Sequence, residues 1–302
     1  MARIQIPRRT VDAVRRQFGD EGDRWLAQFP STLGQLVQRW ELDVDEPFEQ
    51  GLPINVVYPV RQGLRQLVLK TGFPHPETLT ELAMLRLWQG CDGCVQLIDS
   101  DEATGTVLLE RVLPGTSFRS SPIERRSSDI PPLFDLKPLR MSLDKTFPDY
   151  TDWCRRAFSQ YQSGRPDKYF LKHIEKANAC LDEVMAEFDH DWLLHGDLHH
   201  ENMLLASDGR YVAIDPKGVL GAQLMEYGRF IHNFVSDEVD KQQSISKILE
   251  LRVSSLSGDY TEKQLLSAGY IDLVLSCSWT LNEGGTLSSE ADELLGVLGD
   301  MY

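Results

Sequence analysis

The chain has 302 residues, of which 41% are hydrophobic and 25% charged, a composition typical of a globular protein with one large domain or two lobes. Its 46 Asp and Glu residues against 31 Lys and Arg give a formal charge of −15, which repels phosphate backbones and anionic membrane surfaces. We therefore expect neither nucleic acid nor a membrane as a partner. The negative charge would attract a cationic small molecule. The composition does not indicate an oligomeric state.

The cysteines and the N-terminus bear on the compartment. Five cysteines, an odd number spread along the chain, do not form the dense even pattern of a small secreted scaffold. The first residues are basic but lack the apolar region of a signal peptide, and no stretch approaches about 18 consecutive apolar residues. These features predict a soluble protein of the reducing cytoplasm.

The N-terminal third combines helices with a small sheet. Apolar positions recur at helical spacing over residues 11–40 and predict two helices, with an interruption near Pro30. Short β-branched or apolar runs separated by turn residues then predict four strands. They lie at residues 55–60, 67–70, 95–99 and 106–110. A helix is predicted between the second and third strands, over residues 76–88, with Gly90 after its end.

A domain boundary is predicted at Leu113-Pro114-Gly115, which divides the chain into residues 1–112 and 113–302. Residues 116–147 carry no persistent period and predict a long loop or a loop with short helical pieces. Beyond them, four segments are helical by pattern. They lie at residues 150–161, 168–188, 245–256 and 261–279. The expected class is α+β, with a small antiparallel-sheet lobe followed by a mainly helical lobe.

The most informative segment runs from residue 192 to residue 217. It consists of an apolar strand, the loop His-Gly-Asp-Leu-His-His-Glu-Asn, a second strand, an Asp-Gly turn and a third strand that ends at Asp215. Phosphoryl transfer needs a carboxylate that orients the attacking hydroxyl, and oxygen ligands that hold Mg²⁺ on the nucleotide phosphates. Asp197 and Asn202 have the spacing of Asp and Asn in the kinase catalytic loop, and Asp215 takes the place of the DFG aspartate. The combination indicates phosphoryl transfer.

The first lobe of such an enzyme should hold a strand lysine for the phosphates and a helix carboxylate that pairs with it. Lys70 ends an apolar strand, and Glu81 lies on the helix that follows, with Glu77 as a competing partner. No glycine-rich phosphate motif occurs, which leaves residues 55–63 as a glycine-poor candidate for the phosphate-covering loop. Residues Glu110 to Val112, at the lobe junction, are predicted to present backbone groups to adenine.

The catalytic segment, with Ala-Ile-Asp-Pro-Lys at residues 213–217, resembles the aminoglycoside phosphotransferases. Within them it is most similar to the streptomycin 6-phosphotransferase and hydroxyurea-resistance kinase branch. Three further segments also resemble that branch: the strand that ends at Lys70, residues 81–88, and residues 108–111 with Pro114-Gly115. The similarity therefore runs from about residue 50 to about residue 235, and it does not place the last 65 or so residues.

The resemblance implies a two-lobed protein-kinase-like fold that uses ATP and Mg²⁺. It implies Asp197 as the base, Asn202 and Asp215 as metal ligands, and Lys70, paired with Glu81, on the phosphates. The implied reaction moves the γ-phosphoryl group of ATP to a hydroxyl of a small molecule. Streptomycin, hydroxyurea and another metabolite are all candidate substrates. The chain departs from the family pattern at residues 221–227, where Gly-Ala-Gln-Leu-Met-Glu-Tyr replaces a Gly-Asp-Pro-x-Tyr-Asp-like stretch.

The histidines of the loop admit a second interpretation. His195, His199 and His200 invite comparison with the zinc motif H-E-x-x-H. The glutamate of that motif is missing between them, however, and Gly196 disfavours a continuous helix. We therefore expect His195 to hold the loop backbone by hydrogen bonds.

The cysteine pair Cys91 and Cys94 has C-x-x-C spacing. No second pair completes a zinc site, so the spacing predicts a turn.

The alternative function for the whole chain is a non-catalytic nucleotide-binding regulator, similar to a pseudokinase. Loss of a catalytic group would favour it, yet the carboxylates, the amide and the lysine that catalysis needs are all present.

Carboxylates are numerous after the catalytic segment, where the substrate side of a kinase-like site would lie. They are Glu226, Asp237, Glu238, Asp240, Glu283, Glu290, Asp292 and Glu293. Most of them are expected only to solvate helix surfaces, and one or two to contact a cationic substrate.

Overall fold

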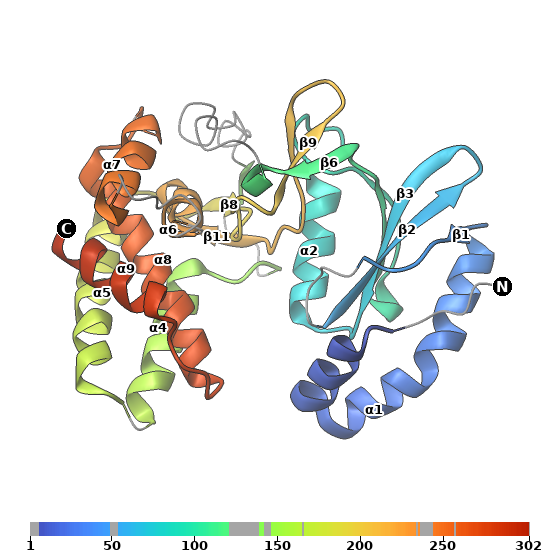
Figure 1. The fold of residues 1–302 in the computed structure, drawn as a ribbon, viewed down its shortest axis with the longest axis horizontal. Helices are drawn as coiled ribbons and strands as arrows, with labels where there is room; N and C mark the ends of the chain where they lie inside the picture. Colours follow the sequence, from blue (N-terminus) through green and yellow to red (C-terminus); the bar gives the residue numbers. More distant parts are fainter. Residues whose placement is uncertain are drawn as a thin grey trace. The chain divides into compact units, whose positions relative to one another are not determined.

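The computed structural model describes residues 6–48, 54–120, 139–141, 146–164, 166–233, 235, 244–256 and 258–301. The chain divides into two compact units, Met1–Gly115 and Thr116–Tyr302, each with a hydrophobic core of its own (Figure 1). The roles predicted for residues 1–112 and 113–302 stay predictions. Among the described residues, no helix combines the length and the apolar character that crossing a membrane requires.

The first unit is built on a five-stranded antiparallel sheet of order β1-β2-β3-β5-β4. Its strands are β1 (Asp43–Val44), β2 (Asn55–Gln62), β3 (Arg65–Gly72), β4 (Leu97–Asp101) and β5 (Thr106–Glu110). The four predicted strands are thus confirmed. β2 and β3 form a hairpin whose turn lies at Gly63, so the predicted phosphate-covering loop consists largely of strand β2.

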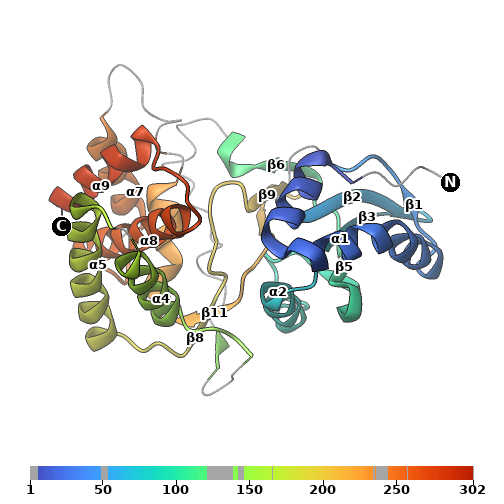
Figure 2. The same cartoon turned by 90° about the horizontal axis from the view of Figure 1, so that it is seen from below.

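Helix α1 (Arg8–Arg39) lies across one face of this sheet (Figure 2). Phe29, Leu33 and Leu36 of its second half share a buried cluster with Tyr58 and Leu69, which are cross-strand partners on β2 and β3. The predicted break near Pro30 was wrong, because the helix continues through that proline. The chain instead kinks at Gly19, where a φ of 51° and a ψ of −129° interrupt the helical backbone.

Helix α2 (Pro76–Leu87) belongs to the other side of the sheet. Successive side chains of a strand point to opposite faces, so Lys70, next to Leu69, points away from the face that α1 covers. Glu81 on α2 forms an ion pair with Lys70, which places α2 on that second face. The helix starts with Pro at its first position, as its sequence predicted.

The second unit contains two small three-stranded sheets that frame the predicted catalytic segment. Their orders are β10-β9-β6 and β11-β8-β7. The strands are β6 (Pro114–Ser117), where the units meet along the chain, β7 (Leu139–Arg140), β8 (Trp192–Leu194), β9 (Met203–Ala206), β10 (Tyr211–Ala213) and β11 (Val219–Gly221). Because β8 precedes residues 195–202 and β9 follows them, both ends of this loop are held by hydrogen-bonded strands.

Helices make up the rest of this unit. They are α4 (Tyr150–Ser163), α5 (Lys168–Glu187), α6 (Gly228–His232), α7 (Ile245–Leu256), α8 (Glu262–Asn282) and α9 (Ser289–Met301). The four predicted helices correspond to α4, α5, α7 and α8, whereas α6 and α9 were not predicted. Short 3₁₀ helices lie at η1 (Glu102–Thr104) in the first unit, and at η2 (Phe118–Ser120) and η4 (Gln223–Tyr227) in this one. Most of the predicted connection at residues 116–147 lies outside the described residues.

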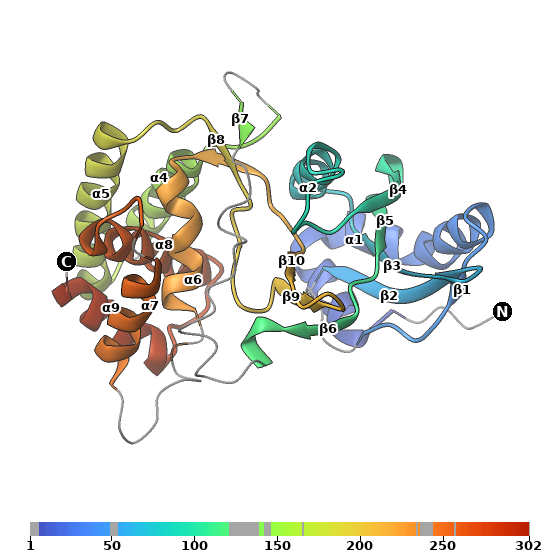
Figure 3. The ribbon, with the colours of Figure 1, turned by 90° about the horizontal axis from the view of Figure 1, so that it is seen from above.

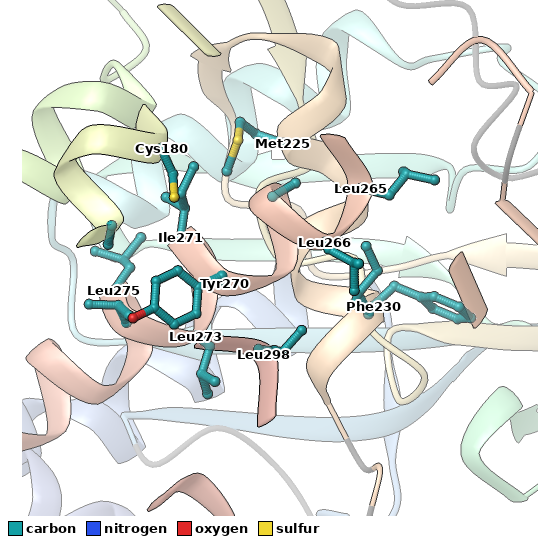
Figure 4. Close-up of a cluster of buried hydrophobic side chains, with 14 of the residues drawn as sticks. Cys180, Met225, Phe230, Leu265, Leu266, Tyr270, Ile271, Leu273, Leu275 and Leu298 are labelled. Atoms are coloured by element: carbon teal, nitrogen blue, oxygen red, sulfur yellow. The ribbon is translucent and has the colours of Figure 1, made fainter. Parts of the chain in front are cut away.

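Helix α8 lies at the centre of the helical core and packs against α4, α5, α6, α7, α9 and η4 (Figure 3). Consecutive residues from Leu265 to Leu275 are buried, so the helix is covered on all sides rather than along one stripe. Figure 4 shows side chains of this core, with Cys180 of α5, Met225 of η4 and Leu298 of α9 among those labelled. Asp272 is the carboxylate within this apolar run.

Candidate active site

The start of the loop between β8 and β9 is hydrogen-bonded to the chain segment that precedes β11. The backbone N–H groups of Lys217 and Gly218 donate to the His195 carbonyl oxygen at 2.8 and 3.3 Å. Gly196 has a φ of 77°, and a Cβ atom there would lie 2.7 Å from Cγ1 of Val219. Glycine is therefore required both for the backbone conformation and for the close approach of the neighbouring strand.

His195 fixes the loop as the sequence analysis expected. Its Nδ1 accepts a hydrogen bond from the Asp197 backbone N–H at 3.2 Å, so its Nε2 carries the proton and donates to the Ile214 carbonyl at 2.9 Å. Burial lowers the pKa of His195 to about 4, which keeps the imidazole neutral at physiological pH. Both ring nitrogens are engaged in the loop, in agreement with a positioning role rather than metal binding.

Glu226 lies below the same loop. Its carboxylate accepts hydrogen bonds from the backbone N–H groups of His195 at 2.6 Å and Gly196 at 3.2 Å. Burial raises the pKa of Glu226 to about 7, although these two hydrogen bonds act in the opposite direction. Glu226, one of the carboxylates considered for substrate contact, is thus part of the loop's support. It occupies the stretch in which the chain departs from the family pattern.

The loop brings the three predicted catalytic and metal-binding residues together. The side-chain amide of Asn202 donates to the Asp197 carbonyl oxygen at 2.9 Å, and the Ile214 N–H donates to the Asn202 carbonyl oxygen at 2.9 Å. This second bond places Asp215, the residue after Ile214, beside the loop. Asp215 has a φ of 60°, a left-handed conformation that costs a non-glycine residue free energy and is concentrated at functional sites.

Two basic residues lie against the carboxylates. Nε of Arg229 is 3.3 Å from Oδ1 of Asp197. Nζ of Lys217 is 3.2 Å from Oδ2 of Asp215 and 3.9 Å from Oδ2 of Asp197. The Asp197 side chain remains 18% exposed, so it is partly accessible while its charge is balanced.

Lys217 and Arg229 were not predicted to belong to the site, and neither was Asp272, which contacts Arg229. Lys217 lies inside the informative segment, but its residue type and spacing alone did not indicate a contact. Asp272 carried a usable signal, because a single carboxylate in a long apolar helix rarely becomes buried without a partner. Arg229 follows the last sheet strand and carried no comparable signal.

In the first unit, Lys70 and Glu81 form the predicted pair. Nζ of Lys70 lies 2.6 Å from Oε1 of Glu81, and both residues are buried. A buried charge needs such a partner, because desolvation without compensation costs several kcal/mol. The alternative partner, Glu77, lies one turn earlier on α2 and accepts a hydrogen bond at its carbonyl oxygen from Thr80.

The predicted adenine-binding segment follows the end of β5. The Glu110 N–H donates to the Gln96 carbonyl at 2.9 Å and the Arg111 N–H donates to the Gln66 carbonyl at 3.4 Å, so these two donors are used within the first unit. Val112 follows these two residues and lies beyond the end of β5 at Glu110. Its backbone stays the candidate for contact with a base.

A divalent cation is implied by the resemblance, and the residues of the second unit fit one. Mg²⁺ prefers carboxylate and carbonyl oxygens and usually keeps waters or phosphate oxygens as further ligands. The Asn202 amide nitrogen donates to the Asp197 carbonyl oxygen, which leaves the amide oxygen as a ligand of the type that Mg²⁺ prefers. Within the described ranges no group of three or more His, Cys, Asp and Glu residues could hold a metal.

Solved structures share this fold. The choline kinase LicA from Streptococcus pneumoniae gives a TM-score of 0.65 at 14% identity and covers 90% of this chain and 98% of its own. A thermostable mutant of the aminoglycoside phosphotransferase APH(4)-Ia, in a ternary complex with ADP and hygromycin B, gives a TM-score of 0.63 at 12% identity, over 89% of this chain and 96% of that chain. These likenesses, with the sheet unit and the helical unit described above, define a two-lobed protein-kinase-like fold and confirm the predicted class.

The chain belongs to the aminoglycoside/hydroxyurea antibiotic resistance kinase family, whose model matches residues 54–284. Streptomycin 6-kinase of Streptomyces glaucescens is 25% identical over 288 residues, which are 93% of this chain and 92% of that protein. Hydroxyurea phosphotransferase of Kitasatospora aureofaciens is 27% identical over 309 residues, 98% of this chain and 87% of that protein. The predicted family branch is confirmed. The protein is a small-molecule phosphotransferase, and the non-catalytic alternative is not favoured.

Proposed function

We propose that this enzyme transfers the γ-phosphoryl group of ATP to a hydroxyl of a small molecule, with Asp197 as the base. The observation that carries the proposal is the placement of Asp197. Its carboxylate is partly accessible, while its loop is held by the strands at both ends and by His195 and Glu226 beneath. A fixed carboxylate of this kind can orient the attacking hydroxyl and accept its proton as the phosphoryl group is transferred.

Nucleotide and metal would be held by the other predicted residues. Asn202 and Asp215 would bind Mg²⁺, which when bound neutralises charge on the phosphates. Lys70, oriented by Glu81, would contact the phosphates, and the backbone from Glu110 to Val112 would contact adenine.

The substrate class is suggested by the relatives. Their names, streptomycin 6-kinase and hydroxyurea phosphotransferase, make streptomycin and hydroxyurea the first compounds to assay, alongside other hydroxyl-bearing metabolites. The acidic character of the chain favours a cationic substrate, and a cytoplasmic location is part of the same proposal.

The decisive experiment is Asp197→Asn, assayed for turnover with a panel of aminoglycosides, sugars, amino alcohols and hydroxyurea at fixed ATP and Mg²⁺. Because the variant removes the base and keeps the shape of the side chain, we expect turnover to fall by about 10²-fold or more while ATP binding is retained. The control is Asp208→Asn, at an exposed turn where Asp208 pairs with Arg210, and it should leave turnover unchanged. Turnover of Asp197→Asn within about twofold of wild type would contradict the assignment.

A further inference from the structure

Arg229 joins the catalytic loop to the helical core. Its Nε lies 3.3 Å from Oδ1 of Asp197 and 3.1 Å from Oδ2 of Asp272. One guanidinium group therefore contacts two carboxylates, one on the loop and one in the middle of α8. The family resemblance assigned no role to either Arg229 or Asp272.

Asp272 is immobilised from several sides. The Tyr150 hydroxyl of α4 donates to its Oδ1 at 2.6 Å, and Nε2 of His232 on α6 lies 2.6 Å from its Oδ2. Burial alone would raise the pKa of Asp272, but the Arg229 charge and the contacts with His232 and Tyr150 lower it to about 2. The side chain is 2% exposed, so α8 holds a permanent, fully partnered carboxylate inside the core.

The guanidinium group is also held along α8 itself. Its Nη1 donates to the Ser276 hydroxyl at 2.8 Å, and its carbon lies 5.8 Å from the centre of the Trp279 ring. Asp272, Ser276 and Trp279 stand at positions i, i+4 and i+7, which share one face of a helix. Arg229 is thus aligned along a single stripe of α8, and an arginine held in this way has one preferred orientation.

The two carboxylates that Arg229 contacts differ in accessibility. Asp272 lies in the core, whereas the Asp197 side chain is 18% exposed. Nε of Arg229 lies beside Oδ1 of Asp197, whereas Nζ of Lys217 and Nε2 of His199 are 3.9 Å from Oδ2. The ion pair with Arg229 therefore restrains Oδ1, and Oδ2 lies farther from its two basic neighbours.

We propose that Arg229, anchored by Asp272, is a positioning residue that holds Asp197 in the orientation for proton transfer from the substrate hydroxyl. This inference rests on the proposed function of Asp197. The hydroxyl proton passes to Oδ2 of Asp197 as the substrate oxygen forms its bond to the γ-phosphorus, and the bond from that phosphorus to ADP breaks. Arg229 keeps its own protons throughout, because a guanidinium is not deprotonated in proteins.

The first test is Arg229→Met. Misplacing a catalytic group by about 1 Å can cost on the order of 10² in rate, so we expect kcat to fall by about 30- to 100-fold while the KM for ATP stays within about twofold. In an Asp197→Asn background the same substitution should slow the enzyme by less than about threefold, because the carboxylate that Arg229 positions is already gone.

This double-mutant cycle distinguishes failure of the positioning role of Arg229 from failure of the assignment of Asp197 as the base. Suppose that Asp197→Asn is slow and that Arg229→Met lowers its kcat by the same factor as in the wild type. Arg229 then acts independently of Asp197, and the positioning role is overturned. If Asp197→Asn turns over at the wild-type rate, the proposed base itself is wrong.

The matched control is Arg252→Met. Arg252 is also buried next to α6, where its Nη1 donates to the carbonyl oxygens of Phe230, Ile231 and Asn233. Its loss should lower the melting temperature but leave kcat per folded molecule within about threefold of wild type. A decrease in kcat as large as that of Arg229→Met would indicate general damage to the core and overturn the proposal.

A second variant tests the anchor if Arg229→Met does not fold. Asp272→Asn keeps the volume and removes the charge that holds Arg229. We expect kcat to fall by roughly tenfold with little change in the KM for ATP. A folded Asp272→Asn enzyme with wild-type kcat would show that the anchor is not needed.

Discussion

Two buried acidic residues near the loop, Glu226 and Asp272, have pKa values that are shifted in opposite directions. Asp272 is paired with Arg229 and remains ionised, with a pKa lowered to about 2 against the desolvating effect of burial. Glu226 accepts two hydrogen bonds from backbone N–H groups, and burial raises its pKa to about 7. A full positive charge thus outweighs desolvation at one residue, and two amide dipoles do not at the other.

The raised pKa of Glu226 predicts a pH-dependent stability. Its folded pKa lies above the ordinary value of 4.5, so the folded protein holds a proton that the unfolded chain has lost between about pH 4.5 and 7. The contribution to stability is therefore complete below that range and disappears as the pH rises through about 7. Relative to Glu226→Gln, the free energy of unfolding of the wild type should fall by about 2 kcal/mol between pH 5.5 and 8.

Urea unfolding of both proteins across that range measures the difference directly. Because His195 and all other titrating groups are present in both proteins, their contributions largely cancel in the comparison. Curves that run parallel from pH 5.5 to 8 would mean that Glu226 is ionised in the folded protein throughout.

At the level of elements, the approach of α6 to α8 depends on small residues. A Cβ atom on Gly228 would lie 2.8 Å from the Ala268 carbonyl oxygen and 2.9 Å from Cβ of Asp272, and one on Gly269 would lie 2.7 Å from Cγ2 of Ile231. The two helices therefore meet backbone against backbone. This close contact brings Arg229 and His232 of α6 within reach of Asp272.

Gly228→Ala should therefore destabilise the protein by about 1–3 kcal/mol, because a methyl group has no space between α6 and α8. Gly228 has a φ of −53°, so alanine would suit its backbone and the loss can be assigned to the contact. Gly296→Ala on α9 is the matched control, since nothing lies within 4 Å of its Cβ position. Alanine there should stabilise the helix by up to about 1 kcal/mol. Thermal unfolding of the two variants, which should shift in opposite directions, checks both statements.

For the whole molecule, the excess of carboxylates is the dominant electrostatic feature. Of the residues considered for substrate contact, Glu283, Asp292 and Glu293 are exposed at the end of α8 and on α9. Asp237, Glu238 and Asp240 lie outside the described residues, and Glu290 is half-buried on α9. The three exposed groups solvate the surface, and the net charge of −15 would draw a cation toward the protein.

A cationic substrate should therefore bind less well at higher salt. Between about 10 mM and 150 mM ionic strength the Debye length shortens from about 30 Å to about 8 Å, so attraction by distant carboxylates is screened. We expect the KM for the cationic substrate to rise by about two- to tenfold over this range, and the KM for ATP to change less in that direction. Steady-state kinetics at several salt concentrations measure both. If the best substrate is neutral, or if its KM does not change with salt concentration, the proposal of a cationic substrate is wrong.

Local patterns in the sequence were sufficient for much of the fold. Strands β2 to β5 and helices α2, α4, α5, α7 and α8 follow from periodicity and turn residues, because those signals act between near neighbours. The break in α1 shows the limit of such patterns. Pro30 is tolerated within a helix whose second half is packed on the sheet, whereas Gly19 adopts a backbone that a composition rule does not foresee.

The candidate site divides in the same way. Asp197, Asn202 and Asp215 could be predicted because their spacing lies within one loop and one hairpin, where chain geometry alone fixes their approach. The pairing of Lys70 with Glu81 followed from the order of strand and helix. Arg229 and Asp272 could not be predicted, because they meet Asp197 and each other only after α6 packs on α8. The sequence by itself determined which chemical groups the catalytic segment carries. Only the tertiary structure decided which charges surround them, because a contact between residues on separate helices depends on how the whole core packs.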